Sequence, residues 1–176
     1  MERLLLGLLA LLCPLSWFLG SSQTIAPPAI EPPVAITALA PTTVLVEDTY
    51  TGAVFSPPLA ENLGLENITG MAIDGYWMPI AVDIAALEER LPTFIEANAD
   101  QFRRDIPDEL ATYTRQYIGF YSNGDPMIYV NAFCQTDFFN WQSDFVFVLD
   151  GGDCYFQVIY NTRAATFSNL MINGDA

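Results

Sequence analysis

The sequence contains no histidine, and because all six of its basic residues are arginine, it contains no lysine either. Without histidine, a Ser-His-Asp triad, a Cys-His pair and an imidazole metal site are excluded. Without lysine, Schiff-base chemistry and a lysine-based phosphate site are excluded too. The chemistry that remains is that of carboxylates, arginine, tyrosine and amides. We predict no catalytic residue, no metal site and no cofactor.

Positive charge is scarce throughout the chain, with 6 basic against 21 acidic residues and a formal net charge of −15. Proteins that bind nucleic acid need a basic surface that releases counterions from the phosphate backbone. The same negative charge disfavours adsorption to anionic lipid. We therefore expect no nucleic-acid partner, and no membrane association once an N-terminal export signal has been removed.

The N-terminal stretch has the three parts of a secretory signal. A short region with one arginine (residues 1–3) precedes an apolar run (residues 4–12), and the small residues Gly20 and Ser22 suit cleavage near Ser22. We predict that residues 1–22 are a signal peptide and that the protein is periplasmic or secreted. The alternative is a protein anchored in the membrane by an uncleaved signal.

The composition divides the chain after the signal into two parts. Residues 23–41 hold five prolines between alanines and threonines, which is typical of an extended linker. Residues 42–176 are long enough for a single domain with its own core. Two cysteines remain in the exported part, Cys134 and Cys154, and an even number in an oxidising compartment favours a disulfide. The alternative is a pair of buried thiols.

One helix is predicted over residues 82–98. Its apolar side chains recur at spacings of three, four and seven residues, at Ile84, Leu87, Leu91, Phe94, Ile95 and Phe102. Asp83 can cap its start, and Pro92 is expected to kink the helix without ending it, because the apolar spacing continues past the proline. The opposite face of the helix is expected to be solvated, and its residues are Glu88, Glu89, Arg90, Thr93 and Glu96. A role of this face as an acidic docking surface is the less favoured alternative.

Strands are predicted after residue 113. Asn123-Gly124 is a strong hairpin signal between residues 114–121 and 126–133. Asp150 to Asp153 predicts a second hairpin between residues 144–149 and 154–160, and residues 166–173 form the last strand. Earlier in the chain, residues 42–46 are expected to form a short edge strand and residues 51–70 a loop.

These elements predict an α+β fold in which one kinked helix packs on a curled antiparallel sheet of about four or five strands. A difficulty concerns the disulfide. With a strand at 144–149 between them, Cys134 and Cys154 would lie at opposite ends of the sheet, much further apart than the roughly 7 Å between Cα atoms that a disulfide tolerates. Either the disulfide is absent or the intervening residues bend back along the sheet.

The predicted strands are apolar on both faces, although an antiparallel strand with one wet face should alternate apolar and polar residues. One helix can cover only one face. The other could be covered by the segment from Val44 to Trp77, by a second copy of the chain, or by a hydrophobic ligand or protein partner. The polar or amphipathic residues expected at such a binding site are Tyr129, Asn131, Trp141 and Gln157.

Carboxylates are the main source of possible chemistry. Asp150 and Asp153 bracket two glycines, and paired carboxylates can serve a glycosidase. Aspartate, asparagine and glycine are also the residues that tight turns require, and we favour that interpretation.

Parts of the chain from Trp77 to Ala176 resemble small exported bacterial proteins of unknown function. The residues that carry this resemblance are Arg115-Gln116-Tyr117, Tyr129 to Cys134, Trp141, Asp150 to Phe156 and Asn173 to Ala176, together with Trp77-Met78-Pro79, Asp83-Ile84 and Leu87-Glu88. The resemblance implies an exported compartment and a shared fold, but no activity. A helix followed by a curled antiparallel sheet also looks like the cystatin-like and NTF2-like architectures. In Gln116 to Phe120 the glycine comes one position too early for the Gln-x-Val-x-Gly motif of cystatin inhibitors, so this segment does not indicate protease inhibition.

The sequence therefore favours an exported, non-enzymatic binding or interaction module of unspecified ligand. Two alternatives stay open. One is a small carboxylate-dependent hydrolase, which requires a cleft with two acids, one of raised pKa. The other is a passive structural domain of the cell envelope.

Overall fold

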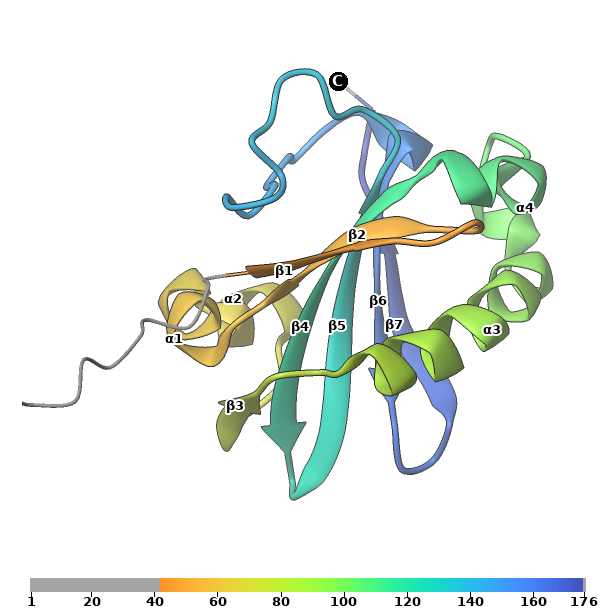
Figure 1. Ribbon diagram of the computed structural model, residues 1–176. Coiled ribbons are helices and arrows are strands. Elements are labelled where there is room, and N and C mark those ends of the chain that lie inside the picture. The colour runs from red at the N-terminus through yellow and green to blue at the C-terminus, as the bar shows by residue number, and fades with distance from the viewer. Residues whose placement is uncertain (1–41, 176) are drawn as a thin grey trace, which may run out of the picture. The chain divides into compact units, whose positions relative to one another are not determined.

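The computed structural model describes residues 42–175, and this part of the chain has an α+β fold (Figure 1). The predicted signal peptide (1–22) and linker (23–41) lie outside the described residues. Seven strands form one mostly antiparallel sheet, which is more than the four or five predicted. The strands are β1 (Thr42–Val46), β2 (Thr51–Phe55), β3 (Gly75–Trp77), β4 (Thr114–Ser122), β5 (Asp125–Phe133), β6 (Tyr155–Asn161) and β7 (Thr166–Ile172). The helices are α1 (Pro57–Ala60), α2 (Leu65–Thr69), α3 (Ala81–Ala97) and α4 (Ile106–Glu109), with single 3₁₀ turns at Glu61–Leu63, Ala99–Gln101, Leu110–Thr112 and Gly152–Cys154.

Strand β4 lies at the centre of the sheet, whose order is β1-β2-β4-β5-β6-β7. One edge of β4 is shared by two strands: β2 pairs with its first half in parallel, and β3 pairs with its second half in antiparallel orientation. The other edge pairs along its whole length with β5. All pairs except β2–β4 are antiparallel.

The predicted hairpin between β4 and β5 is confirmed. Asn123 and Gly124 both have left-handed backbones, with φ of 52° and 76°, and Ser122 pairs with Asp125 on either side of them. Two consecutive residues of positive φ are what a two-residue type I′ turn requires, and asparagine and glycine tolerate this geometry best.

The predicted loop at residues 51–70 is wrong, because Thr51–Phe55 forms β2 and most of the remaining residues form the short helices α1 and α2 and the turn between them. Ala53, Val54 and Phe55 are buried there between β1 and β4. Parallel pairing joins strands that are far apart in sequence and have no turn between them. No local turn signal therefore indicated that this short run would pair with β4. The edge strand predicted at residues 42–46 is confirmed as β1.

The strand predicted at residues 144–149 is also wrong, and so is the hairpin at Asp150 to Asp153. Residues 135–151 form a long connection, hereafter the cross-face loop, and β5 pairs directly with β6. Phe133 and Tyr155 are register partners at one end of this pair. The residues next to them, Cys134 and Cys154, are therefore neighbours with Cα atoms 5.0 Å apart, and the predicted disulfide is confirmed.

The predicted helix is confirmed as α3, which continues through Pro92. Its first turn is closed by Asp83, whose carboxylate accepts a hydrogen bond from the backbone N–H of Ile80 at 3.0 Å. The helix lies across one face of the sheet (Figure 1) and buries Ile84, Leu87, Leu91 and Ile95 against apolar side chains of β4, β5 and β6. Those partners include Tyr117, Ile128, Val130, Phe156 and Val158.

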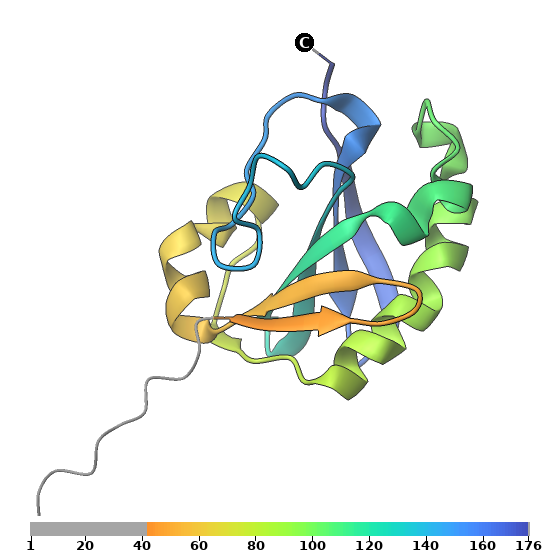
Figure 2. The same cartoon turned by 45° about the horizontal axis from the view of Figure 1, so that its top comes forward.

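The face opposite α3, hereafter the second face, is covered by two separate segments (Figure 2). The stretch from α1 to α2 covers one part with Leu59, Leu65 and Ile68, and it belongs to the early segment, Val44 to Trp77, that was one of the three possible coverings. The cross-face loop covers another part with Trp141 and Phe145. The chain itself therefore supplies most of the cover for its second apolar face.

Replacing both Cys134 and Cys154 with serine should lower the free energy of unfolding by about 3 kcal/mol, because the cross-link closes a loop with a sequence separation of 20 residues. Urea denaturation followed by circular dichroism measures this loss. Dithiothreitol should lower the urea midpoint of the wild type and leave that of the double variant unchanged. An unchanged wild-type midpoint under reducing conditions would contradict the prediction.

Candidate functional site

The second face carries a row of amide side chains that runs from β4 to the end of β7. Gln116 of β4 is the register partner of Asn131 of β5, which in turn is the partner of Gln157 of β6. Asn131 donates to Gln116 at 3.2 Å, and Gln157 donates to Asn131 at 3.3 Å and to Asn173, just after β7, at 3.4 Å. The four side chains form one hydrogen-bonded amide row.

The amide row holds the backbone of the cross-face loop. Gln116 donates to the carbonyls of Trp141 and Asp144, both at 2.8 Å, and accepts from the N–H of Val146 at 2.9 Å. Asn131 donates to the carbonyl of Val146 at 2.7 Å. These bonds satisfy backbone groups that a strand would pair with a neighbouring strand, which explains why residues 144–149 form no strand despite their composition.

At its far end the cross-face loop is held by Asn173. The amide of Asn173 donates to the carbonyl of Val148 at 2.6 Å and to that of Asp150 at 3.1 Å. Hydrogen bonds from side-chain amides of the sheet therefore hold the loop backbone at several points between residues 141 and 150. A loop fixed in this way presents its side chains in a defined arrangement.

The second-face groove is a hollow that remains between the α1–α2 stretch and the cross-face loop. It has two adjoining parts with cavity volumes of about 460 and 510 Å³. Both parts are lined by Asn67 and Ile68 of α2 and by Phe145 and Phe147 of the loop. The groove therefore runs along the seam between the two segments that cover this face.

Three of the four predicted binding residues line one part of this groove. Tyr129 and Asn131 form its floor, where they are almost fully buried, and Gln157 lies half-buried beside them. Trp141 lines neither part; its side chain packs against the sheet under the loop. Both ends of the Asn131 amide are occupied, and Asn131 bonds the loop backbone. Gln157 donates only to Asn131 and Asn173, and its Oε1 has no described hydrogen-bond partner.

Large apolar side chains of the cross-face loop are exposed beside the groove. Phe147 is 61% exposed and Leu149 is 74% exposed, and both line the groove. Phe138 of the same loop is 83% exposed but lines neither part. Neither the composition nor the predicted strand at 144–149 indicated which of these aromatic residues would face solvent.

The groove has little charge. Asp144 is its one charged lining residue among the described residues, and it lies in the part with the larger volume. Burial raises the pKa of the Tyr129 phenol, so the groove floor stays neutral at physiological pH. Uncharged apolar groups suit such a lining better than an anion would, because no arginine is present there to pair with it.

The acids predicted for a hydrolase do not form a cleft. The carboxylate of Asp153 is occupied by backbone N–H groups of Arg103 at 2.6 Å and Arg104 at 2.8 Å. Gly151 and Gly152 have left-handed φ values of 94° and 57°, which confirms that the glycines serve a turn. Asp150 and Asp153 line none of the described cavities.

On the helix side, the prediction that Glu88 lies on the solvated face of α3 is wrong. Its carboxylate is buried, accepts a hydrogen bond from the Tyr117 hydroxyl at 2.7 Å and lies 3.1 Å from the Nε of Arg115. Burial raises the pKa of the Glu88 carboxyl above its usual range, and Arg115 and the Tyr117 hydrogen bond oppose this effect. Glu88 also lines a large acidic cleft beside α3.

In the part of the chain that the structure describes, no group of three or more histidine, cysteine, aspartate or glutamate side chains could hold a metal ion. Between residues 42 and 175, no helix is both long enough and apolar enough to cross a membrane. The candidate sites are thus two surface hollows, the second-face groove and the acidic cleft beside α3.

Replacing Gln116 with leucine should lower the free energy of unfolding by about 3 kcal/mol, because three hydrogen bonds to the cross-face loop are lost. Hydrogen exchange of the Val146 amide should accelerate in the same variant. Gln142→Leu is the matched control, since the exposed Gln142 side chain makes no described hydrogen bond to the sheet. Unchanged exchange at Val146 would show that the amide row does not hold the loop.

The Glu88 pKa sets the sign of a pH dependence. Because this pKa is raised in the folded protein, the contribution of Glu88 to stability is fully present below the ordinary pKa of glutamate and falls as pH rises through the folded value. In Glu88→Gln this dependence disappears. The unfolding free energy of the wild type minus that of the variant should therefore be larger at about pH 4 than at about pH 7. Urea titrations at both pH values measure the difference, and an opposite sign would mean that Arg115 outweighs burial.

No protein-family model, curated protein sequence or solved structure matches this chain. The resemblance to small exported bacterial proteins accordingly remains a hypothesis, and the function is inferred from the geometry of the two hollows.

Proposed function

We propose that the protein is an exported, non-enzymatic binding module whose second-face groove receives an uncharged apolar group. The proposal rests on Phe147 and Leu149, which are mostly exposed and line the groove. Both belong to the cross-face loop, whose backbone is held in place by hydrogen bonds from the amide row. An apolar side chain on a mobile loop must be ordered on binding, at a cost in conformational entropy. A fixed loop reduces that cost.

The preferred ligand is neutral and apolar. Isoleucine, leucine and phenylalanine side chains line the groove, and its polar groups are mainly neutral amides. A free fatty acid or an anionic lipid would bring a carboxylate or phosphate to a protein of net charge −15, with no arginine in the groove to pair with it. A small neutral hydrophobe, or the apolar side chains of a partner protein, meets neither difficulty.

The proposed compartment is the periplasm or the exterior of the cell. The disulfide between Cys134 and Cys154 supports this compartment, because such bonds persist mainly in oxidising surroundings. A protein held at the membrane by its uncleaved signal would occupy the same surroundings and is distinguished by sequencing the mature N-terminus.

A cystatin-like or NTF2-like architecture is likewise a proposal. The packing of α3 on one face of the antiparallel strands β4, β5 and β6 supports it. The parallel strand β2, which joins the edge strand β1 to β4, was not part of that expectation.

A carboxylate-dependent hydrolase centred on Asp150 and Asp153 is not favoured, since Asp153 is committed to backbone N–H groups. A passive envelope domain predicts that changes in the groove have no effect on ligand uptake. A dye-binding comparison of two loop variants separates this possibility from the binding module.

Phe147→Ser should weaken binding of the neutral dye Nile red by about tenfold, because it removes most of the apolar area of an aromatic side chain from the groove wall. Phe138→Ser is the matched control: it makes the same change on the same loop at an exposed aromatic that does not line the groove. Fluorescence titration of the purified protein and of both variants measures the dissociation constants.

Equal weakening by the two substitutions, or no dye uptake by the wild type, would count against the groove as the binding site. Native mass spectrometry of the same samples tests whether a second copy of the chain covers the groove. A dimer that Phe147→Ser dissociates and Phe138→Ser does not would identify that copy as the occupant.

A further inference from the structure

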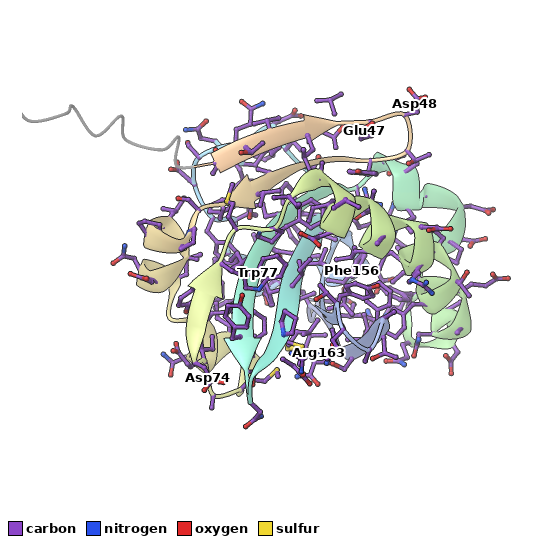
Figure 3. The ribbon with its side chains drawn as sticks, turned by 60° about the horizontal axis from the view of Figure 1, so that its bottom comes forward. Glu47, Asp48, Asp74, Trp77, Phe156 and Arg163 are labelled. Carbon is purple, nitrogen blue, oxygen red and sulfur yellow. A yellow bond between two sulfur atoms is a disulfide. The ribbon has the colours of Figure 1, made fainter. Side chains whose placement is uncertain are left out.

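The acidic cleft beside α3 has a volume of about 890 Å³ and is larger than either part of the second-face groove. It lies between the β1–β2 turn, the N-terminal half of α3, and the α4 region. Figure 3 shows Glu47 and Asp48 at that turn, beside α3. Nothing in the proposed function of the second-face groove uses this cleft, which lies on the other side of the sheet.

A buried carboxylate with one free oxygen forms part of the cleft lining. The side chain of Glu88 is only 7% exposed. Its Oε1 accepts the hydrogen bond from Tyr117 and faces Arg115. Its Oε2 has no hydrogen-bond partner among the described residues, and Glu88 is one of the residues that line the cleft.

Arg115 pairs with one oxygen of Glu88 and uses its remaining donors on the backbone. Its two terminal nitrogens donate to the backbone carbonyls of Tyr113 at 2.6 Å and Leu110 at 3.0 Å, and its Nε faces Glu88 Oε1. The guanidinium therefore holds one oxygen of Glu88 in place and leaves the other available. Burial raises the pKa of the Tyr117 phenol, and the adjacent Glu88 adds to the effect, so Tyr117 remains a hydrogen-bond donor to Oε1.

The rim of the cleft is acidic and its walls are apolar. Glu47, Asp48 and Glu89 are exposed on the rim, so four acids and one arginine line the cleft, a net charge of −3 (1 − 4). Burial and then the nearby Glu47 and Glu88 raise the pKa of the Tyr50 phenol, as expected in a negative potential. Between rim and floor the walls are formed by small or aliphatic side chains: Ala81, Val82, Ala85, Pro92, Leu110 and Ala111.

We propose that this cleft binds an alkylammonium group, with its nitrogen donating to Oε2 of Glu88 and its aliphatic chain lying along the apolar walls. An ammonium has donors and no acceptor, which fits a carboxylate oxygen without a partner. A chain of methylene groups fits the apolar walls, and the acidic rim attracts a cation during its approach. The same chemistry is offered by a free diamine and by a lysine side chain of a partner protein.

A solely structural role for Glu88 explains its contacts with Arg115 and Tyr117. It does not account for a second carboxylate oxygen without a described partner at a cavity whose rim carries three further acids. The two roles differ in what they predict for a ligand: a structural Glu88 has no preference for an ammonium over an alcohol of the same length.

The test is an NMR titration of ¹⁵N-labelled protein with cadaverine, a five-carbon diammonium, and with pentane-1,5-diol, its neutral counterpart. Cadaverine should shift the backbone amides of residues 47–50 and 85–89, and the diol should leave them unchanged. Glu88→Gln, which keeps the shape of the side chain, should weaken cadaverine binding by about tenfold or more. A rim substitution, Glu89→Gln, should weaken it by about twofold, as expected for an exposed charge.

Glu96→Gln is the matched control, because it removes the same charge from an exposed position of the same helix that does not line the cleft. It should leave binding unchanged. If Glu88→Gln proves unfolded, the comparison of Glu89→Gln with Glu96→Gln still decides the question. Equal effects of cadaverine and the diol, or equal affinities of the Glu89 and Glu96 variants, would overturn the proposal, since either outcome means that no specific ammonium site exists.

A second arm separates the two sources of the ligand. A short alanine-based peptide with one central lysine is compared with the same peptide carrying norleucine. Tighter binding of the lysine peptide than of cadaverine, at the same residues, identifies a protein partner as the source. Tighter binding of cadaverine identifies a free amine. Failure of both amines, with normal Nile red binding by the groove, would refute the ammonium site and leave the proposed function standing.

Discussion

The arrangement of the second face depends on how the backbone of the cross-face loop is satisfied. A buried or half-buried peptide group needs a hydrogen-bond partner, and this loop finds most of its partners in side chains and not in a neighbouring strand. Gln116, Asn131 and Asn173 supply these bonds. The loop can therefore lie across the sheet, where it covers apolar residues of β4 and β5 and leaves the groove open beside α2.

The two faces of the sheet are built on different principles. Beneath α3 the packing is apolar, and its main interruption is the buried contact of Glu88 with Arg115 and Tyr117. On the second face a polar amide row runs between apolar clusters. A buried charge requires a compensating partner close by, whereas a neutral amide can bond to the backbone on both sides. The acidity of the hollow on the helix side comes mainly from the exposed acids Glu47, Asp48 and Glu89, which have no counterparts of that number around the groove on the loop side.

Much of the fold could be predicted from the sequence, because its signals were local. The periodicity of Ile84, Leu87, Leu91 and Ile95 indicated α3, and Asn123-Gly124 indicated the β4–β5 hairpin. The parallel pairing of β2 with β4 could not be predicted in this way, because the two strands are separated by more than fifty residues and share no turn. The composition of residues 144–149 suited a strand and led to a wrong prediction. What keeps these residues out of the sheet is their hydrogen bonding to the amide row, which depends on the three-dimensional arrangement of distant residues.

The candidate sites could be predicted in part from the sequence. A two-residue turn at Asn123-Gly124 fixes the pairing of the flanking strands, so Gln116 and Asn131, each seven residues from the turn, had to lie side by side. Glu88 lies four residues after Ile84 and three before Leu91, a position on the buried stripe of α3. The charge of its side chain led to the opposite prediction. The ion pair of Glu88 with Arg115 could not be predicted either, because Arg115 lies on β4, far from Glu88 in the sequence.

The cross-face loop is closed at its base by the disulfide and bonded to the amide row along its length. Its fold thus depends on backbone carbonyls and N–H groups, which every residue except proline offers alike. Substitutions at outward positions such as 138, 147 and 149 leave those groups in place. The side chains at these positions can therefore change, and with them the ligand preference of the groove, while the conformation of the loop backbone is kept.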